Sequence, residues 1–398
     1  MSLNYLKKLT TPTIFMCLLM GPSVFAKSKK RRSSLKPALL KKVLKKKRSK
    51  SSKSTISYFN EDLLKSRFVS WGIAPNNTAS SINLLGAWKK FKKKKEIVVA
   101  VIDTGIDPHH PFLAKNLYVP KGTVSTNNFG LDFSKNKKFK NRPSDSHGHG
   151  THVSGIVKSV FPSVKILTLK YYNPKASGQD NLTSTIRALK YAIDSNVDII
   201  NYSGGGPEPA LEELRVLKMA EKKGILVVAA AGNEESNIDN RDNAYYPASY
   251  GLKNIITVTA HDQKLKLLSS SNYGKNSVDL AAPGYRIRSA YPHARASYLT
   301  GTSQATAFVT GVAALIKSQF PALTAAQVKE VINQSSRKEI TLTTRCLSGG
   351  RLDAGNAMRL AKKMSRGEAK RSLANKSNFE ESKKQDKKQG KIHYRFAN

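Results

Sequence analysis

Three short segments of this 398-residue chain each carry one side chain that could take part in acyl transfer. Asp103 follows the apolar pair Val101-Ile102, His149 lies in the glycine-rich segment 147–153 (HGHGTHV), and Ser303 lies in 301–306 (GTSQAT). A serine hydroxyl is a weak nucleophile until an imidazole takes its proton, and a carboxylate can orient that imidazole. The three segments together therefore supply a carboxylate, a base and a nucleophile, in the chain order Asp, His, Ser.

Taken singly, each segment has an ordinary structural explanation. An Asp at the end of a strand is usually a cap or a turn residue, and a serine at the start of a helix is more often an N-cap than a nucleophile. The histidine-rich glycine loop could bind a metal or simply form a turn. The chemistry is indicated only by the three segments jointly.

The elements that must position these residues can be read from the pattern of apolar residues. Short runs rich in β-branched residues, without clean alternation, are typical of parallel strands buried on both faces. Helical patterns of about 10 to 18 residues between them are long enough to cross back over a sheet. The sequence thus predicts an α/β domain of three layers, with a mostly parallel central sheet flanked by helices and its active site beyond the carboxyl ends of the strands. The predicted strands are 96–103, 164–170, 197–203, 224–231 and 254–260, and the predicted helices are 151–160, 182–195, 208–223, 302–319 and 325–334.

Further segments, read with these three, resemble the subtilase family of serine proteases over roughly residues 70 to 360. Residues 201–206 (NYSGGG) resemble the family's substrate-binding strand, and residues 229–234 (AAAGNE) resemble its oxyanion-hole segment. Residues 281–284 (AAPG) and 349–354 (GGRLDA) resemble segments found late in the catalytic domain. The chain is therefore identified as a member of this family, which implies a subtilisin-like fold and a serine endopeptidase acting on proteins and peptides through an acyl-enzyme.

The resemblance also implies roles for single residues. Asp103, His149 and Ser303 correspond to the catalytic triad, with His149 preferred over His147, which is expected to lie exposed in the preceding loop. Asn233 corresponds to the oxyanion-hole donor. Peptide is expected to bind as an added strand between residues 203–205 and the segment near 176–178. The expected substrate-binding residues are Ser203, Gly204, Gly205, Ala230 and Gly232; small residues here also fit a plain core strand.

The chain departs from the family pattern at several places. Gln304 stands where many relatives have Met beside the nucleophile, so the site is expected to tolerate peroxide. Ala307-Phe308 replaces the common Pro-His in the nucleophile helix. Phe112 occupies a position where calcium-binding relatives carry an Asp ligand, so no cofactor is expected to be required and that calcium site is doubtful. Asp239 and Asp242 could form another calcium site, although a solvated turn is the preferred interpretation.

The two ends of the chain differ from its middle in composition. A signal peptide over 1–26 is predicted by the basic pair Lys7-Lys8, the apolar run 14–24 and the small residues of Val24-Phe25-Ala26, with a secreted or periplasmic mature protein. Residues 27–53 hold 14 Lys or Arg and no acid, and residues 362–398 hold 12 Lys or Arg and four acids, within a net charge of +41. Such segments bury too little apolar surface to fold. The expected division is therefore 1–26 signal, 27–56 disordered basic segment, 57–361 peptidase domain and 362–398 disordered basic tail, without a folded prodomain.

Other properties follow less directly from the composition. With Cys17 in the signal, Cys346 is expected to be a buried thiol rather than an intermolecular bridge. The basic arms could bind an anionic surface or be solvated linkers, and they could be removed by proteolysis. Specific nucleic-acid binding is not expected, because export is predicted and aromatic residues are not interleaved with the lysines of the arms. A monomer is the default. Two other functions stay open: an inactive subtilase scaffold that binds peptides, and a protein whose main role is polyanion binding.

Overall fold

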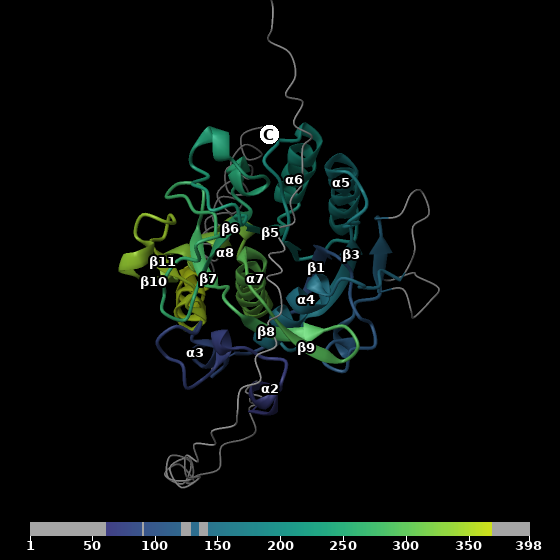
Figure 1. Cartoon of the computed structure of the whole chain (residues 1–398). Helices are drawn as coiled ribbons and strands as arrows, with labels where there is room; N and C mark the ends of the chain where they lie inside the picture. Colours follow the sequence, from purple (N-terminus) through teal and green to yellow (C-terminus); the bar gives the residue numbers. More distant parts are fainter. Residues whose placement is uncertain (1–60, 90, 121–128, 135–141, 368–398) are drawn as a thin grey trace, which may run out of the picture.

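The computed structural model describes residues 61–89, 91–120, 129–134 and 142–367 of the chain, and its centre is one sheet (Figure 1). In the described part of the chain this sheet has nine strands in the order β10-β11-β7-β6-β5-β4-β1-β3-β2. All neighbouring pairs run parallel except β10 and β11 at one edge. The strands are β1 (Val98–Asp103), β2 (Gly130–Asp132), β3 (Lys165–Lys170), β4 (Ile199–Tyr202), β5 (Leu226–Ala230), β6 (Ile255–His261), β7 (Leu280–Pro283), β10 (Arg337–Lys338) and β11 (Gly350–Arg351).

Both faces of the sheet are covered, which explains the unbroken apolar runs of its strands. In β1, Val99 and Val101 belong to one apolar cluster, whereas Ala100 and Ile102 belong to another on the opposite face. Successive side chains of a strand point to opposite faces, so a strand between two helical layers must be apolar at nearly every position. The predicted α/β class and three-layer architecture are confirmed.

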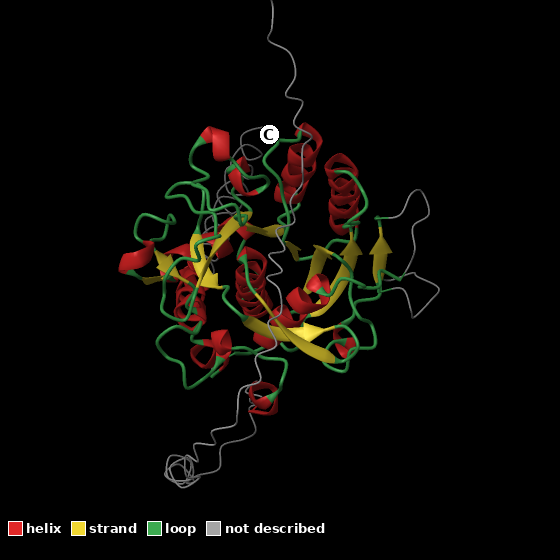
Figure 2. Cartoon of the chain, viewed as in Figure 1, coloured by secondary structure: helices red, strands yellow, loops and turns green. Residues whose placement is uncertain are grey.

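The helices form the two outer layers, as Figures 1 and 2 show. On one face lie α5 (Gly178–Asp194) and α6 (Leu211–Lys222), whose apolar residues join the cluster containing Ala100. On the other face lie α4 (His149–Val160), α7 (Thr302–Gln319) and α8 (Ala325–Ser335). The helix α7 is buried over nearly its whole length. The short helices α2 (Glu61–Lys65) and α3 (Leu84–Trp88) pack against this second face.

Several elements differ from the sequence prediction. The antiparallel pair β8 (Ile287–Tyr291) and β9 (Arg295–Leu299), and the strands β2, β7, β10 and β11, were not predicted. The helix α5 begins at Gly178, four residues before the predicted start at Leu182, because Ser177 accepts a hydrogen bond from the Asp180 N–H and caps it.

The two basic ends of the chain lie almost entirely outside the described residues. The predicted signal 1–26 and basic segment 27–56 are not described, nor are residues 368–398. A final helix spans 354–367, so the folded part continues beyond residue 361, and residues 362–367 of the expected disordered tail are helical. In the described ranges, no helix combines the length and the apolar character needed to cross a bilayer.

Candidate active site

Asp103 and His149 form a buried pair at the carboxyl end of β1. The strand ends at Asp103, α4 begins at His149, and their side chains are 2 % and 7 % exposed, respectively. His149 Nδ1 lies 2.8 Å from Asp103 Oδ1 and 3.0 Å from Oδ2. Because a carboxylate can only accept, we assign the imidazole proton to Nδ1, which leaves Nε2 as a proton acceptor facing away from Asp103.

The electrostatic surroundings favour a charged imidazole. Burial lowers the pKa of His149, but the charge and hydrogen bond of Asp103 and the charge of Asp145 raise it, and the net pKa is raised. The pair can therefore hold the positive charge that His149 would acquire by taking a proton.

Asp145 holds the loop before His149 in place, and the sequence analysis did not single it out. Its Oδ1 accepts hydrogen bonds from the Gly148 N–H at 2.7 Å and the His147 N–H at 3.0 Å. Its Oδ2 accepts from Thr151 N–H at 2.9 Å and Thr151 Oγ1 at 2.6 Å. Burial raises the pKa of Asp145, but its hydrogen bonds, chiefly those from Thr151 and Gly148, together lower the pKa by more. The net pKa is below its ordinary value, so the carboxylate stays ionised.

Thr104 links the same carboxylate to the end of β1. Its hydroxyl donates to Asp145 Oδ1 at 2.9 Å and accepts from the Gly150 N–H at 2.9 Å. Gly148 precedes α4 with φ at +100°, and a Cβ atom there would lie 2.2 Å from the Tyr291 ring. The turn before His149 thus requires glycine.

Ser303 lies in the first turn of α7 beside the end of β4. The residue is 7 % exposed, and Oγ donates to the Ser203 carbonyl at 3.3 Å. Tyr202 of β4 pairs with Ile102 of β1, so the next residues, Ser203 and Asp103, lie at the ends of neighbouring strands. Neighbouring strands are about 4.8 Å apart. Among the described residues, no hydrogen bond joins Ser303 to His149, so the hydroxyl would have to rotate to reach the imidazole. Catalytic hydrogen bonds are often loose before substrate binds.

Asn233 lies after β5 and faces the same helix N-terminus. Its Oδ1 accepts from the Thr302 N–H at 2.9 Å and from Thr302 Oγ1 at 3.2 Å. These bonds fix the orientation of the carboxamide, because only its oxygen can accept them. The amide NH₂ therefore points away from Thr302.

The expected substrate-binding residues lie at the carboxyl ends of β4 and β5, which are neighbours in the sheet. Close packing explains why Gly204 and Gly205 carry no side chain: a Cβ atom would lie 2.5 Å from Tyr171 Oη and 2.3 Å from the Tyr246 carbonyl, respectively. Gly232 has φ at +102°, which favours glycine. Ala230 ends β5 and is 3 % exposed.

The structure also places His147 and the residues at which the chain departs from the family pattern. His147 was expected to be exposed but is half-buried, with its ring 5.9 Å from that of Tyr172, and its Nδ1 has no hydrogen-bond partner among the described residues. Gln304 is buried. Ala307 and Phe308 lie within α7, which continues unbroken to Gln319, so replacing Pro-His leaves the helix regular.

The surroundings of Phe112 do not fit a calcium ion. Its ring lies 4.4 Å from the Lys158 ammonium, which also donates to the Phe112 carbonyl. The Lys158 ammonium thus already contacts that oxygen. The Asp239 carboxylate is half-buried and accepts from the backbone N–H groups of Asn276 and Ser277, so it joins two loops that are distant in sequence. The described residues contain no group of three His, Cys, Asp or Glu arranged to hold a metal.

Cys346 is fully buried, and burial raises the pKa of its thiol. This surrounding is typical of an unreactive structural cysteine rather than of a nucleophile.

The chain is similar to several known proteins. A family model described as "Subtilase family" matches residues 94–388. The "Major intracellular serine protease" of Bacillus subtilis (strain 168) is 36% identical over 240 residues, which cover 58% of this chain and 71% of that protein. The "Thermostable alkaline protease" of Halalkalibacterium halodurans is 33% identical over 288 residues, 70% of each chain. A solved structure titled "Crystal Structure of a Lanthipeptide Protease" has a TM-score of 0.56 at 23% identity, covers 66% of this chain and 87% of its own, and bears on the fold alone.

Proposed function

Because the chain belongs to the subtilase family and is a serine-type endopeptidase, we propose that Asp103, His149 and Ser303 form its catalytic triad. The observation that carries this proposal is the buried Asp103–His149 pair at the end of β1, beside the strand whose end contacts Ser303. Its substrates are proteins and peptides.

The first chemical step transfers a proton from Ser303 to His149. On substrate binding, the Ser303 hydroxyl leaves the Ser203 carbonyl and donates to His149 Nε2. As Oγ attacks the scissile carbonyl, Nε2 takes the proton, and the resulting imidazolium is stabilised by Asp103, which remains ionised. The same proton then passes to the leaving amine, the C–N bond breaks and an acyl-enzyme remains, which water hydrolyses by the reverse order of steps.

Negative charge on the substrate oxygen is stabilised by two N–H donors. The carboxamide of Asn233 is oriented by the hydrogen bond that its oxygen accepts from Thr302, and the backbone N–H of Ser303 lies at the N-terminus of α7. Donors fixed before the reaction cost no reorganisation when the charge develops. The N-terminus of a helix also favours negative charge.

Peptide binds in extended form along residues 203–205. The backbone of Ser203, Gly204 and Gly205 offers hydrogen bonds that any peptide can satisfy, and the side of the site near 176–178 supplies the opposite edge. Ala230 and Gly232 form a wall for the residue before the cleaved bond, where small side chains leave room for a large one.

The mature enzyme acts outside the cytoplasm as a monomer that needs no calcium. The predicted signal over 1–26 supports export, and the Lys158 ammonium beside Phe112 supports independence from calcium. The basic ends serve as sites of proteolytic trimming and as attachment to anionic surfaces. N-terminal sequencing of protein recovered from the host that finds Lys27 intact would argue against trimming at the N-terminal arm.

The decisive experiment is casein hydrolysis by the purified wild type beside Ser303→Ala, with the product masses measured. Cleavage by the wild type alone, together with labelling of Ser303 by a fluorophosphonate, supports the mechanism. If both proteins are folded and neither cleaves casein nor reacts with the probe, even after the basic ends are removed, the inactive peptide-binding scaffold becomes the better interpretation.

A further inference from the structure

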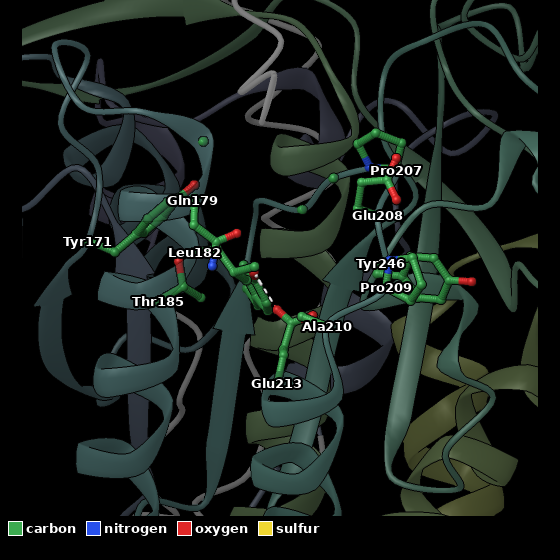
Figure 3. Close-up of a pocket in the computed structure, with 14 residues that line it drawn as sticks. Tyr171, Gln179, Leu182, Thr185, Pro207, Glu208, Pro209, Ala210, Glu213 and Tyr246 are labelled. Carbon is green, nitrogen blue, oxygen red and sulfur yellow. Dashed lines mark hydrogen bonds between the residues drawn. The ribbon is translucent and has the colours of Figure 1, made fainter. Parts of the chain in front are cut away.

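A cavity of about 480 Å³ opens beside the substrate strand, at the beginnings of α5 and α6. Its lining includes Gly205 and Gly206 after β4, and Gly178 and Leu182 of α5. The first turn of α6 contributes Glu213, which Figure 3 labels together with Leu182. Gly205 is one of the residues expected to bind substrate, whereas Ala230 and Gly232 do not line this cavity. The cavity therefore lies along the peptide path but is separate from the wall next to the cleaved bond.

Glu213 places a carboxylate in this cavity without a cation to balance it. The residue is 2 % exposed, Oε1 accepts from Tyr202 Oη at 2.8 Å, and Oε2 accepts from Tyr250 Oη at 3.0 Å. No Lys, Arg or His among the described residues forms an ion pair with it, although the chain has 68 Lys and Arg against 27 acids. In so basic a protein, a buried acid without a cationic partner is unexpected.

Burying this carboxylate alone is unfavourable. Burial raises the pKa of Glu213, and the hydrogen bonds from the two tyrosines offset only part of that effect. An isolated buried charge is costly unless an opposite charge or further donors reach it. A cation entering the cavity would supply what the protein does not.

The walls of the cavity suit the stem of a long cationic side chain. Tyr171, Tyr202 and Tyr246 contribute aromatic rings, and Leu182 and Pro207 contribute apolar surface. Lysine and arginine bury their methylene groups against such walls and present the charged head at the end. An ammonium or guanidinium is also attracted to tyrosine faces. An acidic side chain would instead meet a like charge.

The distance along the strand indicates which substrate residue reaches the cavity. Ser203 contacts the nucleophile, and the cavity begins at Gly205 and Gly206, two to three residues further on, at about 3.3 Å per residue. The wall for the residue before the cleaved bond follows β5, next to β4, so the peptide along residues 203–206 belongs to the acyl side of the substrate. The side chain in question comes about three to four residues before the cleaved bond.

We propose that this cavity binds a lysine or arginine side chain of the substrate at that position, and that Glu213 is the residue that selects it. The inference rests on the proposed function, because it requires peptide to lie along residues 203–205. It identifies the substrate class as proteins and peptides with a basic residue shortly before the cleavage site.

The test uses full-length wild type and fluorogenic peptides that differ at one position only. Lys, Arg, Leu and Glu are placed in turn three and then four residues before the cleaved bond, and kcat/KM is measured. At one of the two positions we expect Lys and Arg to exceed Leu by on the order of tenfold or more, with Glu the poorest. Equal cleavage of all four at both positions would overturn the inference while leaving the proposed function intact. Cleavage of none, with no fluorophosphonate labelling, would instead refute the proposed function.

A matched pair of variants tests the assignment to Glu213. Glu213→Gln keeps the shape and removes the charge, so the ratio of kcat/KM for Lys and Leu peptides should fall close to one. Glu212→Gln removes the same charge from the same helical turn, but Glu212 pairs with Lys190 and does not line the cavity, so its ratio should match the wild type. A purely structural role of Glu213 would lower stability without changing the ratio, and a preserved ratio in Glu213→Gln would overturn the assignment. If that variant does not fold, the wild-type peptide series decides.

Discussion

His149 and Glu213 are both buried at the carboxyl ends of neighbouring strands, yet their charges are balanced in different ways. His149 bonds to Asp103 at the end of β1, within a loop tied by Asp145. Glu213 bonds to Tyr202 at the end of β4 and has neutral donors only. In the proposed mechanism His149 gains a positive charge during the reaction, and Asp103 already supplies the opposite charge. Glu213 has no such partner in the protein, and the proposed partner is a cation carried by the substrate.

Disrupting the Asp103–His149 pair should have the largest effect on the rate. Asp103→Asn keeps the size of the side chain but removes the charge and favours the wrong imidazole tautomer. We expect kcat to fall by about 10⁴-fold, as for other enzymes of this mechanism. The measurement is kcat on a fluorogenic peptide, with thermal unfolding as the control for folding. A folded variant with more than a tenth of the wild-type kcat would contradict the assigned role.

Removing the side-chain donor for the oxyanion should have the next largest effect. In Asn233→Ala, kcat should fall by about 10²–10³-fold while KM stays within a few-fold, because the donor acts mainly in the transition state. Steady-state kinetics separate the two parameters. A change confined to KM would show that Asn233 binds the substrate rather than stabilising the oxyanion.

Loosening the loop that carries His149 should reduce both stability and rate. Asp145→Ala leaves the N–H groups of Gly148 and Thr151 without their acceptor, which should lower the free energy of unfolding by about 3 kcal/mol. Misplacing His149 should lower kcat/KM by about 10². Asp145→Asn should recover part of both losses in denaturant titrations and in rate assays. Unchanged kcat/KM in a destabilised Asp145→Ala would limit this residue to a structural role.

The charge state of His149 predicts a pH dependence of opposite sign for rate and stability. Its pKa in the folded chain is raised above the ordinary value of 6.5. The protonated form stabilises the fold, so this contribution is complete below pH 6.5 and is lost as pH rises through the folded pKa. Catalysis needs the neutral base, so kcat/KM should rise with pH over the same range. A kcat/KM profile whose acid limb lies below pH 6.5 would disagree with this prediction.

Removing the charge of Glu213 should have the smallest effect, a change in Tm that depends on pH. The pKa of Glu213 in the folded chain is raised above 4.5, so its contribution to stability is complete below pH 4.5 and is lost as pH rises through the folded pKa. Wild type should therefore lose Tm relative to Glu213→Gln as pH rises through this window, by about 2 °C or more. A pH-independent difference in Tm would show that ionisation of Glu213 does not destabilise the folded chain. Adding a lysine-containing peptide substrate to the Ser303→Ala protein at neutral pH should raise Tm by mass action.

The elements that carry the candidate triad could be predicted from sequence because their signals are local. The runs ending at Asp103 and at Ala230 are apolar at almost every position, and α7 was predicted with its observed bounds of Thr302 and Gln319. The strands β10 and β11 have two residues each, too few to show a period. Gln179 and Asp180 hid the start of α5, which only its Ser177 cap reveals.

Positioning and specificity residues were harder to predict because they depend on contacts distant in sequence. Asp145 lies four residues before His149, and an acid at this position could have suggested a side chain that accepts hydrogen bonds from the His-Gly-His loop. Glu213 looked like an ordinary surface acid in the first turn of an amphipathic helix, beside the similar Glu212. Its burial depends on Tyr202 and Tyr250, which only the folded chain brings together. No local pattern separates these two glutamates.

The burial of α7 has a consequence for how the enzyme fails. Ser303 is carried by a helix that is enclosed from Thr302 to Ser318, so its amides can exchange with solvent only when most of the domain opens. Hydrogen exchange in this segment should therefore report the global opening free energy, whereas exposed segments such as the one around Ile340 exchange through local fluctuations. Local unfolding or proteolytic cleavage at such surface sites would leave Ser303 in place. Loss of activity on heating should therefore coincide with cooperative unfolding of the core.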